Sequence, residues 1–206
     1  MRCHSESSWQ HGFKKGHSTK DHIHQVDEWV KDGANLVFTD FASAYNSLKW
    51  SAIIEGCEKA EEDLCKRLKR DYKGHTTKRI AMILQRQKFK INDDNYVYPA
   101  SGVPQGSVIS PDLFNIGLNH IFKSTRFEES GIEVRAYADD LVYKIDNDLQ
   151  LKILKAWLFE VLPTFGLNIR VEKCAANFEN DLGIPVKKKL LLFRNQCIRK
   201  QGGPTI

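Results

Sequence analysis

The chain has 206 residues, 41% of them hydrophobic and 28% charged, which is the composition of a soluble globular protein with one sizeable core. Its five cysteines form an odd set without a Cys-x-x-Cys pair, which argues against a disulfide framework and a zinc module and favours a reducing compartment. We find neither a signal peptide nor an apolar run long enough to span a membrane, so we expect an intracellular protein, nuclear or cytoplasmic, without membrane association.

The first predicted helix begins near residue 18. Ser18 or Thr19 provides the N-cap, and Asp21 is placed to complete a capping box. Three apolar residues lie on one face of this helix: Ile23, Val26 and Val30. His22 and His24 would point to nearly opposite faces, so we interpret them as surface residues rather than as a metal site.

A short apolar strand, 36–41, follows and carries a single carboxylate, Asp40, near its end. A helix-like stretch from 42 to 60 comes after it. We then expect a helix over 61–72, a strand over 78–91, a turn at 92–94 and a second strand over 95–99.

The positive charge is concentrated in the middle of the chain. The net charge of +5 is by itself a weak indicator of a polyanionic partner. Between Lys66 and Lys90, however, ten lysines and arginines accompany a single acid, Asp71. Two interpretations stay open for this region: a solvated helix face, or a surface that contacts a phosphate backbone.

The second half of the chain begins with a loop, 101–107, which leads to a predicted helix with Ser110 as N-cap and Pro111 at the first helical position. The apolar face of this helix is Phe114, Leu118, Ile121 and Phe122. A β-hairpin is predicted over 132–145, and a helix over 148–162 that ends at Pro163 and Gly166. The inward face of that last helix is Leu151, Leu154, Trp157, Leu158 and Val161.

Two adjacent acids, Asp139 and Asp140, lie at the predicted tip of the hairpin. Such a pair is most often a solvated turn, and repulsion between the acids does not favour it within an apolar hairpin. The pair is explained if a divalent cation binds between it and a third acid, and Asp40, at the end of another strand, is the candidate. Acids on neighbouring strands are the arrangement that binds two metals for an in-line phosphoryl displacement.

Strands that alternate with helices indicate an α+β fold, in which helices cover one face of a small antiparallel sheet. This arrangement suggests an α+β palm.

Six short blocks follow one another along the chain. They are Gln10–Thr19, Phe38–Tyr45, Ser101–Asn115, Tyr137–Asp140, Gly166–Lys173 and Leu182–Ile184. In this order they resemble the reverse transcriptases and, within them, the non-LTR (LINE-type) retrotransposon enzymes. A serine after Gln105-Gly106 favours the LINE-type branch over the group II intron enzymes.

The resemblance implies that Asp40, Asp139 and Asp140 bind two Mg²⁺ ions, with Mn²⁺ as a substitute and the Phe41 carbonyl in the coordination sphere. Tyr45 would lie under the sugar of the incoming nucleotide and exclude a ribose 2′-hydroxyl. The alternative for Tyr45 is an aromatic residue in the core of helix 42–60.

Three further residues are implied to contact the template base and the nucleotide: Pro104, Gln105 and Gly106. The alternative is a simple glycine-proline turn. Lys173 would donate a proton to the departing pyrophosphate as general acid, or else be a solvated lysine. The block Gln10–Thr19 would brace the fingers against the template.

The implied activity is RNA-directed DNA polymerisation of a non-LTR retrotransposon, with an RNA template, a DNA primer and deoxynucleoside triphosphates as partners. A second hypothesis is a catalytically silent remnant of such an element that binds nucleic acid through its basic region. A palm-type nucleotide cyclase shares the two-metal chemistry, but the blocks at Gln10–Thr19 and Gln105-Gly106 argue against it.

The resemblance also predicts the parts of the domain. Residues 1–35 and 61–100 are fingers-like, 36–60 and 101–184 form the palm, and 185–206 begin a connection to a thumb that we expect to be lacking. Three residues depart from the family pattern: Asn46, Asp112 and Gly117, of which the glycine is expected to weaken its helix.

Overall fold

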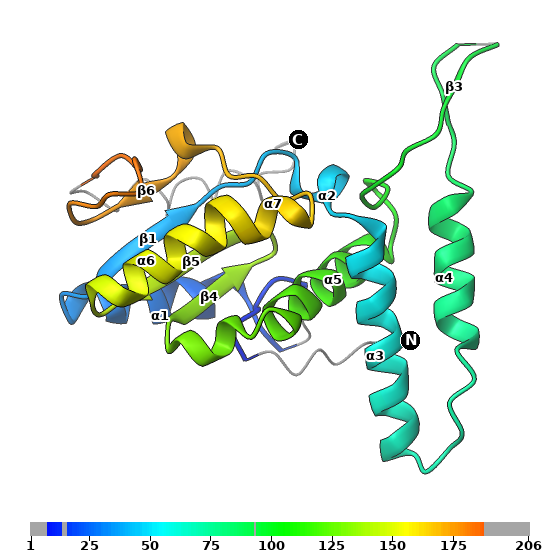
Figure 1. The fold of residues 1–206 in the computed structure, drawn as a ribbon, viewed down its shortest axis with the longest axis horizontal. Coiled ribbons are helices and arrows are strands. Elements are labelled where there is room, and N and C mark those ends of the chain that lie inside the picture. Colours follow the sequence, from blue (N-terminus) through cyan, green and yellow to red (C-terminus); the bar gives the residue numbers. More distant parts are fainter. Residues whose placement is uncertain (1–7, 14–15, 93, 188–206) are drawn as a thin grey trace, which may run out of the picture. The chain divides into compact units, whose positions relative to one another are not determined.

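The computed structural model describes residues 8–13, 16–92 and 94–187 (Figure 1). The chain divides into two compact units. We call residues 8–41, 130–158 and 169–187 the strand unit, and residues 42–129 and 159–168 the helical unit. Each is described by itself.

The strand unit is built on a four-stranded sheet with the order β4-β5-β1-β6. Its strands are β4 (Glu133–Tyr137), β5 (Asp140–Ile145), β1 (Asn35–Thr39) and β6 (Ala175–Ala176). All three strand pairs are antiparallel. The predicted α+β class with a small antiparallel sheet is therefore confirmed, as is the hairpin that carries the acid pair.

Helices cover both faces of this sheet, and not one face alone. Helix α1 (Thr19–Lys31) lies on one face, where Trp29 joins Phe38 and Val142 in the buried core. Helix α6 (Asp148–Ala156) lies on the other face, as Figure 1 shows. A π-helical turn (Trp157–Val161) follows it, and a short 3-10 helix (Val171–Lys173) precedes β6. Coverage on both sides explains why β1 is buried from Leu36 to Thr39.

Helix α1 begins as the sequence predicts, but it buries a different stripe. The Ser18 side chain accepts from the Asp21 amide, and the Asp21 carboxylate accepts from the Ser18 amide, which confirms the capping box. The buried residues are His22, Val26 and Trp29, spaced i, i+4 and i+7. The expected surface position of His22 is therefore wrong, because this residue is only 5% exposed, whereas Val30, expected inside, is 38% exposed.

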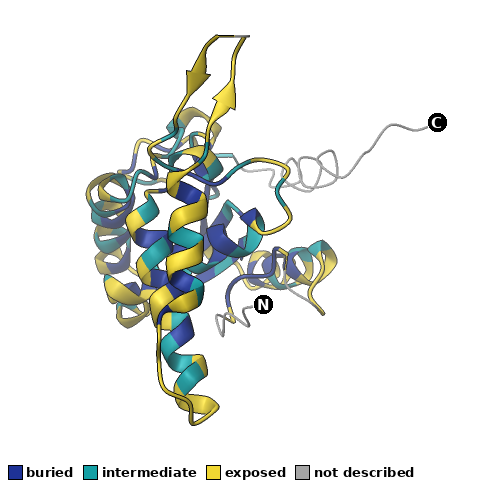
Figure 2. Ribbon diagram, turned by 90° about the vertical axis from the view of Figure 1, so that its right-hand side faces the viewer, coloured by how far each residue is buried: buried dark blue, intermediate teal, exposed yellow. Residues whose placement is uncertain are grey.

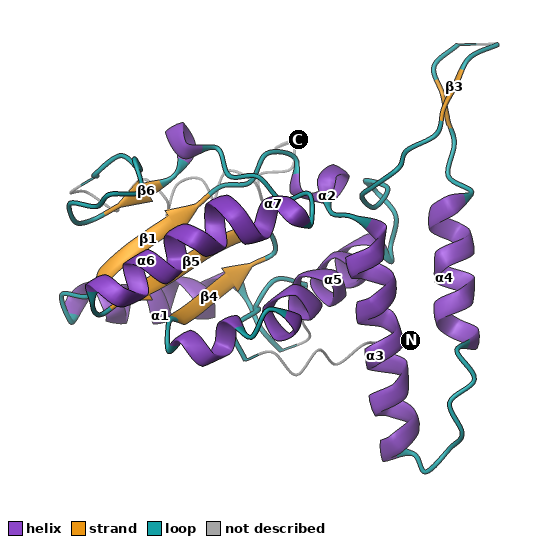
Figure 3. Cartoon of the chain, viewed as in Figure 1, coloured by secondary structure: helices purple, strands orange, loops and turns teal. Residues whose placement is uncertain are grey.

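The helical unit contains longer helices and one isolated β-ribbon. Its elements are α2 (Ala44–Ser47), α3 (Trp50–Arg67), α4 (His75–Gln85), β2 (Phe89–Lys90), β3 (Tyr96–Val97), α5 (Ser110–Ser124) and α7 (Leu162–Thr164). A 3-10 helix, Phe127–Ser130, follows α5. Figure 3 shows α4 where the sequence predicts a strand from 78 to 91. From 78 to 85 that prediction is wrong, because the buried positions, Thr77 and Leu84, follow a helical spacing, whereas β2 lies within the last part of the predicted range.

Two glycines let helices α3 and α5 cross closely. A Cβ added at Gly56 of α3 would lie 2.9 Å from Ile116 of α5, and one added at Gly117 of α5 would lie 3.1 Å from Ile53 of α3. Gly117 departs from the family pattern and lowers the helix propensity of α5, but the absence of a Cβ lets the two helices pack closely. His120 of α5 and Glu55 of α3 also approach, with 3.1 Å between the ring nitrogen and the carboxylate.

Helix α4 is held to α3 by one buried acid. Glu61 accepts hydrogen bonds from the Thr76 amide at 3.2 Å and from the Thr77 amide and hydroxyl at 3.0 and 2.8 Å. The carboxylate thus caps the first turn of α4 from a neighbouring helix, in place of a side-chain N-cap on α4 itself.

Candidate active site

The three predicted metal ligands lie in the strand unit, on adjacent strands. Asp40 follows the last residue of β1, and β1 pairs with β5 so that Thr39 is opposite Leu141. When this register is continued by one residue, Asp40 lies opposite Asp140. All three carboxylate residues are partly exposed.

The acid pair is carried by a tight turn with one strained residue. Tyr137 pairs with Asp140, which leaves Ala138 and Asp139 as the two central residues of the hairpin. Ala138 has a φ of 59°, in the left-handed region that residues with a Cβ rarely occupy. Neighbouring structure must therefore hold this turn in place.

Gln10 provides that support. Its side-chain amide donates to the Ala138 carbonyl at 3.0 Å, and its side-chain oxygen accepts from the Ala138 amide at 3.0 Å. The same oxygen accepts from the Gly12 amide at 2.8 Å. The backbone beside Gln10 pairs with β4, because the His11 amide donates to the Ala136 carbonyl at 2.8 Å. A Cβ on Gly12 would lie 2.2 Å from the Ala138 nitrogen, so the glycine is required there.

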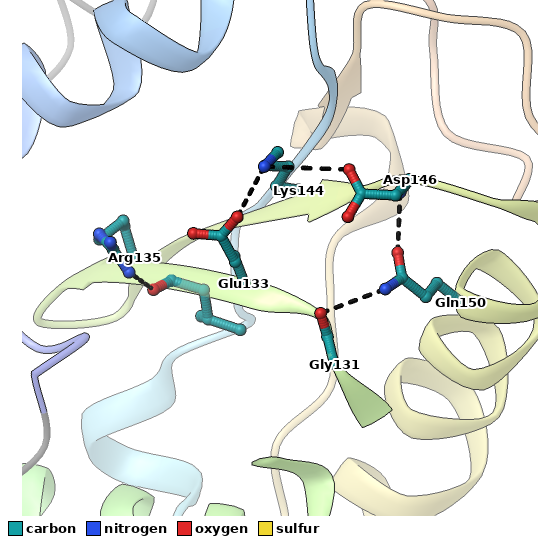
Figure 4. Close-up of polar contacts among 7 residues, drawn as sticks. Gly131, Glu133, Arg135, Lys144, Asp146 and Gln150 are labelled. Atoms are coloured by element: carbon teal, nitrogen blue, oxygen red, sulfur yellow. Dashed lines mark hydrogen bonds and ion pairs between the residues drawn. The ribbon is translucent and has the colours of Figure 1, made fainter. Parts of the chain in front are cut away.

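The opposite end of the hairpin is fixed by a second polar network (Figure 4). Gln150 donates to the Gly131 carbonyl at 3.1 Å and accepts from the Asp146 amide at 2.7 Å. Across the strands, Lys144 and Glu133 approach to 2.6 Å, and this hydrogen bond raises the pKa of Lys144. With Gln10 at the turn and Gln150 at the base, the register that presents the acid pair is held at both ends.

Asp40 is engaged by an arginine. The guanidinium of Arg170 donates twice to one oxygen of the Asp40 carboxylate, from Nε at 2.7 Å and from Nη2. The backbones are joined as well, because the Arg170 amide donates to the Asp40 carbonyl at 2.8 Å. The Cys174 thiol accepts from the Asp40 amide at 3.5 Å, and burial raises the pKa of this cysteine to about 11.

The donor set suits Mg²⁺, since three carboxylates supply the hard oxygen ligands that this ion prefers. In the arrangement shown, however, no three acidic, histidine or cysteine side chains of the described residues come close enough to hold a metal. The Arg170 guanidinium bonds to the Asp40 carboxylate in this arrangement. The residue types therefore suit the ion, while in this arrangement Arg170 occupies one oxygen of the Asp40 carboxylate.

Phe41 and Lys173 are the other predicted site residues of the strand unit. Phe41 is buried, and its backbone forms a bridge with Ile169. Lys173 is exposed at the end of the short 3-10 helix. Its role as general acid stays a prediction.

The remaining predicted residues lie in the helical unit. Tyr45 is half-buried and stacks on Phe114 of α5, with ring centroids 4.5 Å apart and planes 10° apart. Its carbonyl accepts from the Val103 amide at 2.7 Å, which ties α2 to the loop 101–107. The ring thus has a packing partner on one face, and its predicted contact with a nucleotide sugar stays untested.

The loop 101–107 is firmly held at its start and open at its tip. Gly102 donates to the Leu48 carbonyl at 2.7 Å and accepts from the Trp50 indole at 2.7 Å. Pro104 is half-buried and its carbonyl accepts from the Ser110 hydroxyl, whereas Gln105 and Gly106 are exposed. Gly106 has a φ of 84° with open space around it, which suits a loop that a ligand approaches closely.

Sequence reasoning missed two residues of this site. The contact of Gln10 with the turn joins positions 128 apart in the chain, and only the position of Gln10 within a recognised block marked it. Arg170 lies inside the block Gly166–Lys173, but no spacing rule indicated that its guanidinium would reach Asp40.

The sheet, its flanking helices and the carboxylates at adjacent strand ends define the palm of a nucleic-acid polymerase. The family model "Reverse transcriptase (RNA-dependent DNA polymerase)" matches residues 2–189, and the chain belongs to this family. The resemblance inferred from the sequence is thereby confirmed.

Two retrotransposon proteins are among the relatives. The chain is 29% identical over 120 residues to the Pol polyprotein of the type-1 retrotransposable element R2 of Popillia japonica, covering 53% of this chain. It is 25% identical over 196 residues to the RNA-directed DNA polymerase from mobile element jockey of Drosophila melanogaster, covering 85% of this chain. In both cases the matched part is 20% of the relative's length.

A solved structure has the same fold. Telomerase from Candida tropicalis, in complex with a fragment of telomeric RNA, superposes with a TM-score of 0.65 at 16% identity, over 88% of this chain and 34% of that one. At this identity the match concerns the fold alone. Within the described residues, none of the helices has the length and apolar character needed to cross a bilayer.

Proposed function

We propose that this domain catalyses RNA-directed DNA synthesis, extending a DNA primer on an RNA template with deoxynucleoside triphosphates. The observation that carries the proposal is the strand register that places Asp40 opposite the turn with Asp139 and Asp140. Such a register brings acids from two adjacent strands to the same end of the sheet, and polymerisation by metal-assisted nucleotidyl transfer needs acids from neighbouring strands.

Asp40, Asp139 and Asp140 would hold two divalent cations, Mg²⁺ or Mn²⁺, which lower the pKa of the primer 3′-hydroxyl and neutralise the triphosphate. The chain's own part is to position these acids. Gln10 holds the backbone of the turn, and Asp40 becomes available when Arg170 releases it. Arg170 can then turn its charge toward a phosphate of the nucleotide.

The other predicted residues keep proposed roles that fit their positions. Tyr45, half-buried beside Phe114, would contact the sugar, and Pro104, Gln105 and Gly106 would lie along the template base and nucleotide. Lys173, being exposed, can reach a departing pyrophosphate and donate its proton.

Primer extension by the full chain on an RNA template, with Mg²⁺ and deoxynucleotides, tests the proposal. We expect extension that is abolished in Asp139→Asn and retained in Asp146→Asn, an exposed acid at the far end of β5. Circular dichroism must show that all three proteins are folded. Equal activity of wild type and Asp139→Asn would refute the assignment, and folded wild type that binds RNA without extending the primer would refute the activity of this chain.

A further inference from the structure

The β2–β3 ribbon of the helical unit has two chemically different faces. Phe89 pairs with Val97, and Lys90 pairs with Tyr96. Because side chains alternate along a strand and paired residues share a face, each face can be assigned. One carries Lys88, Lys90, Tyr96 and Tyr98, and the other carries Phe89, Ile91 and Val97. We call these the Lys/Tyr face and the apolar face.

A contact within the ribbon supports the assignment. The ammonium of Lys88 lies over the ring of Tyr96, 5.0 Å from its centroid, which requires both side chains to be on the same side. The next pair on the apolar side continues the register, since the Ile91 amide donates to the Asn95 carbonyl at 2.9 Å.

Every residue of β2 and β3 is exposed, and Figure 2 shows both strands in the colour of exposed residues. Tyr98 is 69% exposed and Tyr96 43%, and on the other face Ile91 is 67% exposed. A two-stranded ribbon on its own is at best marginally stable in water, and large exposed aromatic residues in a group mark an interaction site. The ribbon therefore presents a surface for a partner.

Charge indicates which partner. Helix α4, which leads to the ribbon, contains no acid; its exposed residues include Arg79, Met82 and Ile83, and the exposed Arg86 directly follows it. From His75 to Tyr98 the sequence has five lysines and arginines and two acids, Asp93 and Asp94. A cationic surface with interleaved tyrosines is complementary to a polyanion that also offers flat rings.

We propose that the Lys/Tyr face binds single-stranded RNA, with bases stacked on Tyr96 and Tyr98 and the phosphate backbone against Lys88. Unpaired bases are required, because bases within a duplex have no free ring face for a tyrosine. The choice of RNA rests on the proposed function, in which the template is RNA.

Binding of a labelled single-stranded RNA to the full chain, measured by fluorescence anisotropy over a salt series, tests the proposal. Tyr96→Ala and Tyr98→Ala are each expected to weaken binding about tenfold, the usual loss for one base-stacking ring. Tyr98→Phe should bind as wild type does, because stacking uses the ring. Lys88→Gln should reduce the slope of log K against log salt by about 0.7, the value for one phosphate contact on a single strand.

The apolar face provides matched controls. Ile91→Thr and Val97→Thr alter the same ribbon on its other side, keep a β-branched residue and should change RNA affinity by less than about twofold. If these variants weaken binding as much as the tyrosine variants do, the Lys/Tyr face is not the site. If they instead abolish self-association of the chain while no tyrosine variant affects RNA, the ribbon is a protein interface and the proposal is wrong.

Two comparisons separate RNA from other nucleic acids. Duplex of the same sequence bound as tightly as the single strand would contradict base stacking. Single-stranded DNA bound more tightly than RNA would contradict the choice of RNA.

Failure of this proposal differs from failure of the proposed function. Wild-type primer extension together with unchanged RNA affinity in Tyr96→Ala and Tyr98→Ala would overturn the RNA surface and leave the polymerase intact. Loss of RNA binding in the tyrosine variants of a chain that extends no primer would support the surface and overturn the activity.

Discussion

The β4–β5 hairpin and the β2–β3 ribbon are both two-stranded antiparallel pairs, but the structure supports them very differently. The turn of the first is held by buried hydrogen bonds from Gln10, and its base by Gln150. The second has exposed side chains on both faces and a cation–π contact of its own.

This difference suits the role proposed for each hairpin. Carboxylates that hold metal ions must keep their positions to a fraction of an ångström, which requires a backbone fixed by many contacts. A surface that binds a flexible strand by stacking tolerates movement, because each ring acts almost independently. We therefore expect substitutions around β4–β5 to affect stability and turnover together, and substitutions on the β2–β3 ribbon to affect binding alone.

The largest effect should come from Gln10→Ala. Removing this side chain leaves the buried amides of Gly12 and Ala138 without their acceptor and releases a strained turn. We expect the free energy of unfolding to fall by about 3 kcal/mol. Primer extension should fall with it, even at temperatures where the variant stays folded.

Urea unfolding and steady-state primer extension check this expectation. Gln25→Ala is the control, because Gln25 lies in the same unit and bonds to Arg135 at 2.6 Å, away from the turn. A Gln10 variant as stable and active as the control would show that the turn does not depend on this contact.

His22 makes the strand unit sensitive to pH. Burial, and then the nearby charges of His11 and Arg135, lower the pKa of His22 to about 4 from its ordinary 6.5. Below pH 6.5, His22 is protonated in the unfolded chain but stays neutral in the folded protein until the pH nears 4. The free energy of unfolding attributable to His22 is therefore constant above pH 6.5 and falls as the pH drops toward 4. The loss attributable to His22 approaches about 3 kcal/mol.

Urea titrations between pH 7 and pH 4 measure this loss. His22→Gln should flatten the pH dependence, whereas His24→Gln, at an exposed position of the same helix, should leave it as in the wild type. The same slope in both variants would assign the pH dependence to other groups.

The β4–β5 hairpin was predictable from sequence, and the β2–β3 ribbon was only partly so. The strand 36–41 and the hairpin 132–145 have β-branched and aromatic runs, and Asp40, Asp139 and Asp140 lie within them. The local sequence pattern is enough to predict these strands, and it also locates the three acids, because they lie at the strand ends.

Other features depend on tertiary contacts that local pattern does not encode. The sequence predicts a strand over 78–91, but Glu61 supplies a helix cap to the Thr76 amide from 15 residues away. Strand β6 is only two alanines, and it is a strand because β1 presents an edge to it. His22 is buried because His11 packs near it, with ring centroids 5.8 Å apart.

Substitution of Glu61 tests whether the helical unit unfolds locally while the sheet stays folded. Burial works to raise the pKa of its carboxyl, but the hydrogen bonds from Thr77 and Thr76 outweigh it and the pKa is lowered. The cap is therefore complete above the ordinary pKa of 4.5 and is lost as the pH falls through the lowered value. At pH 7, Glu61→Gln should destabilise by about 1–2 kcal/mol.

Hydrogen exchange locates the effect. Amides of α4 should exchange faster in Glu61→Gln while amides of β1 and β5 keep their protection, and Glu62→Gln, with its exposed partner Lys59, should change neither. Equal acceleration in the sheet would show that the two units unfold as one.

The smallest effect, and the one closest to the chemistry, concerns Arg170. Its guanidinium competes with any cation for the Asp40 carboxylate, so Arg170→Gln should raise the affinity for Mn²⁺ about tenfold, measured by electron paramagnetic resonance of the free ion. Lys155→Gln removes an equal charge from an exposed pair with Asp181 and should leave the affinity unchanged. If both variants bind Mn²⁺ alike, net charge and not the direct contact sets the affinity. If Arg170 only blocked the metal, Arg170→Gln would extend primers faster than the wild type. If Arg170→Gln instead binds Mn²⁺ more tightly but extends primers more slowly, the arginine also acts on the nucleotide.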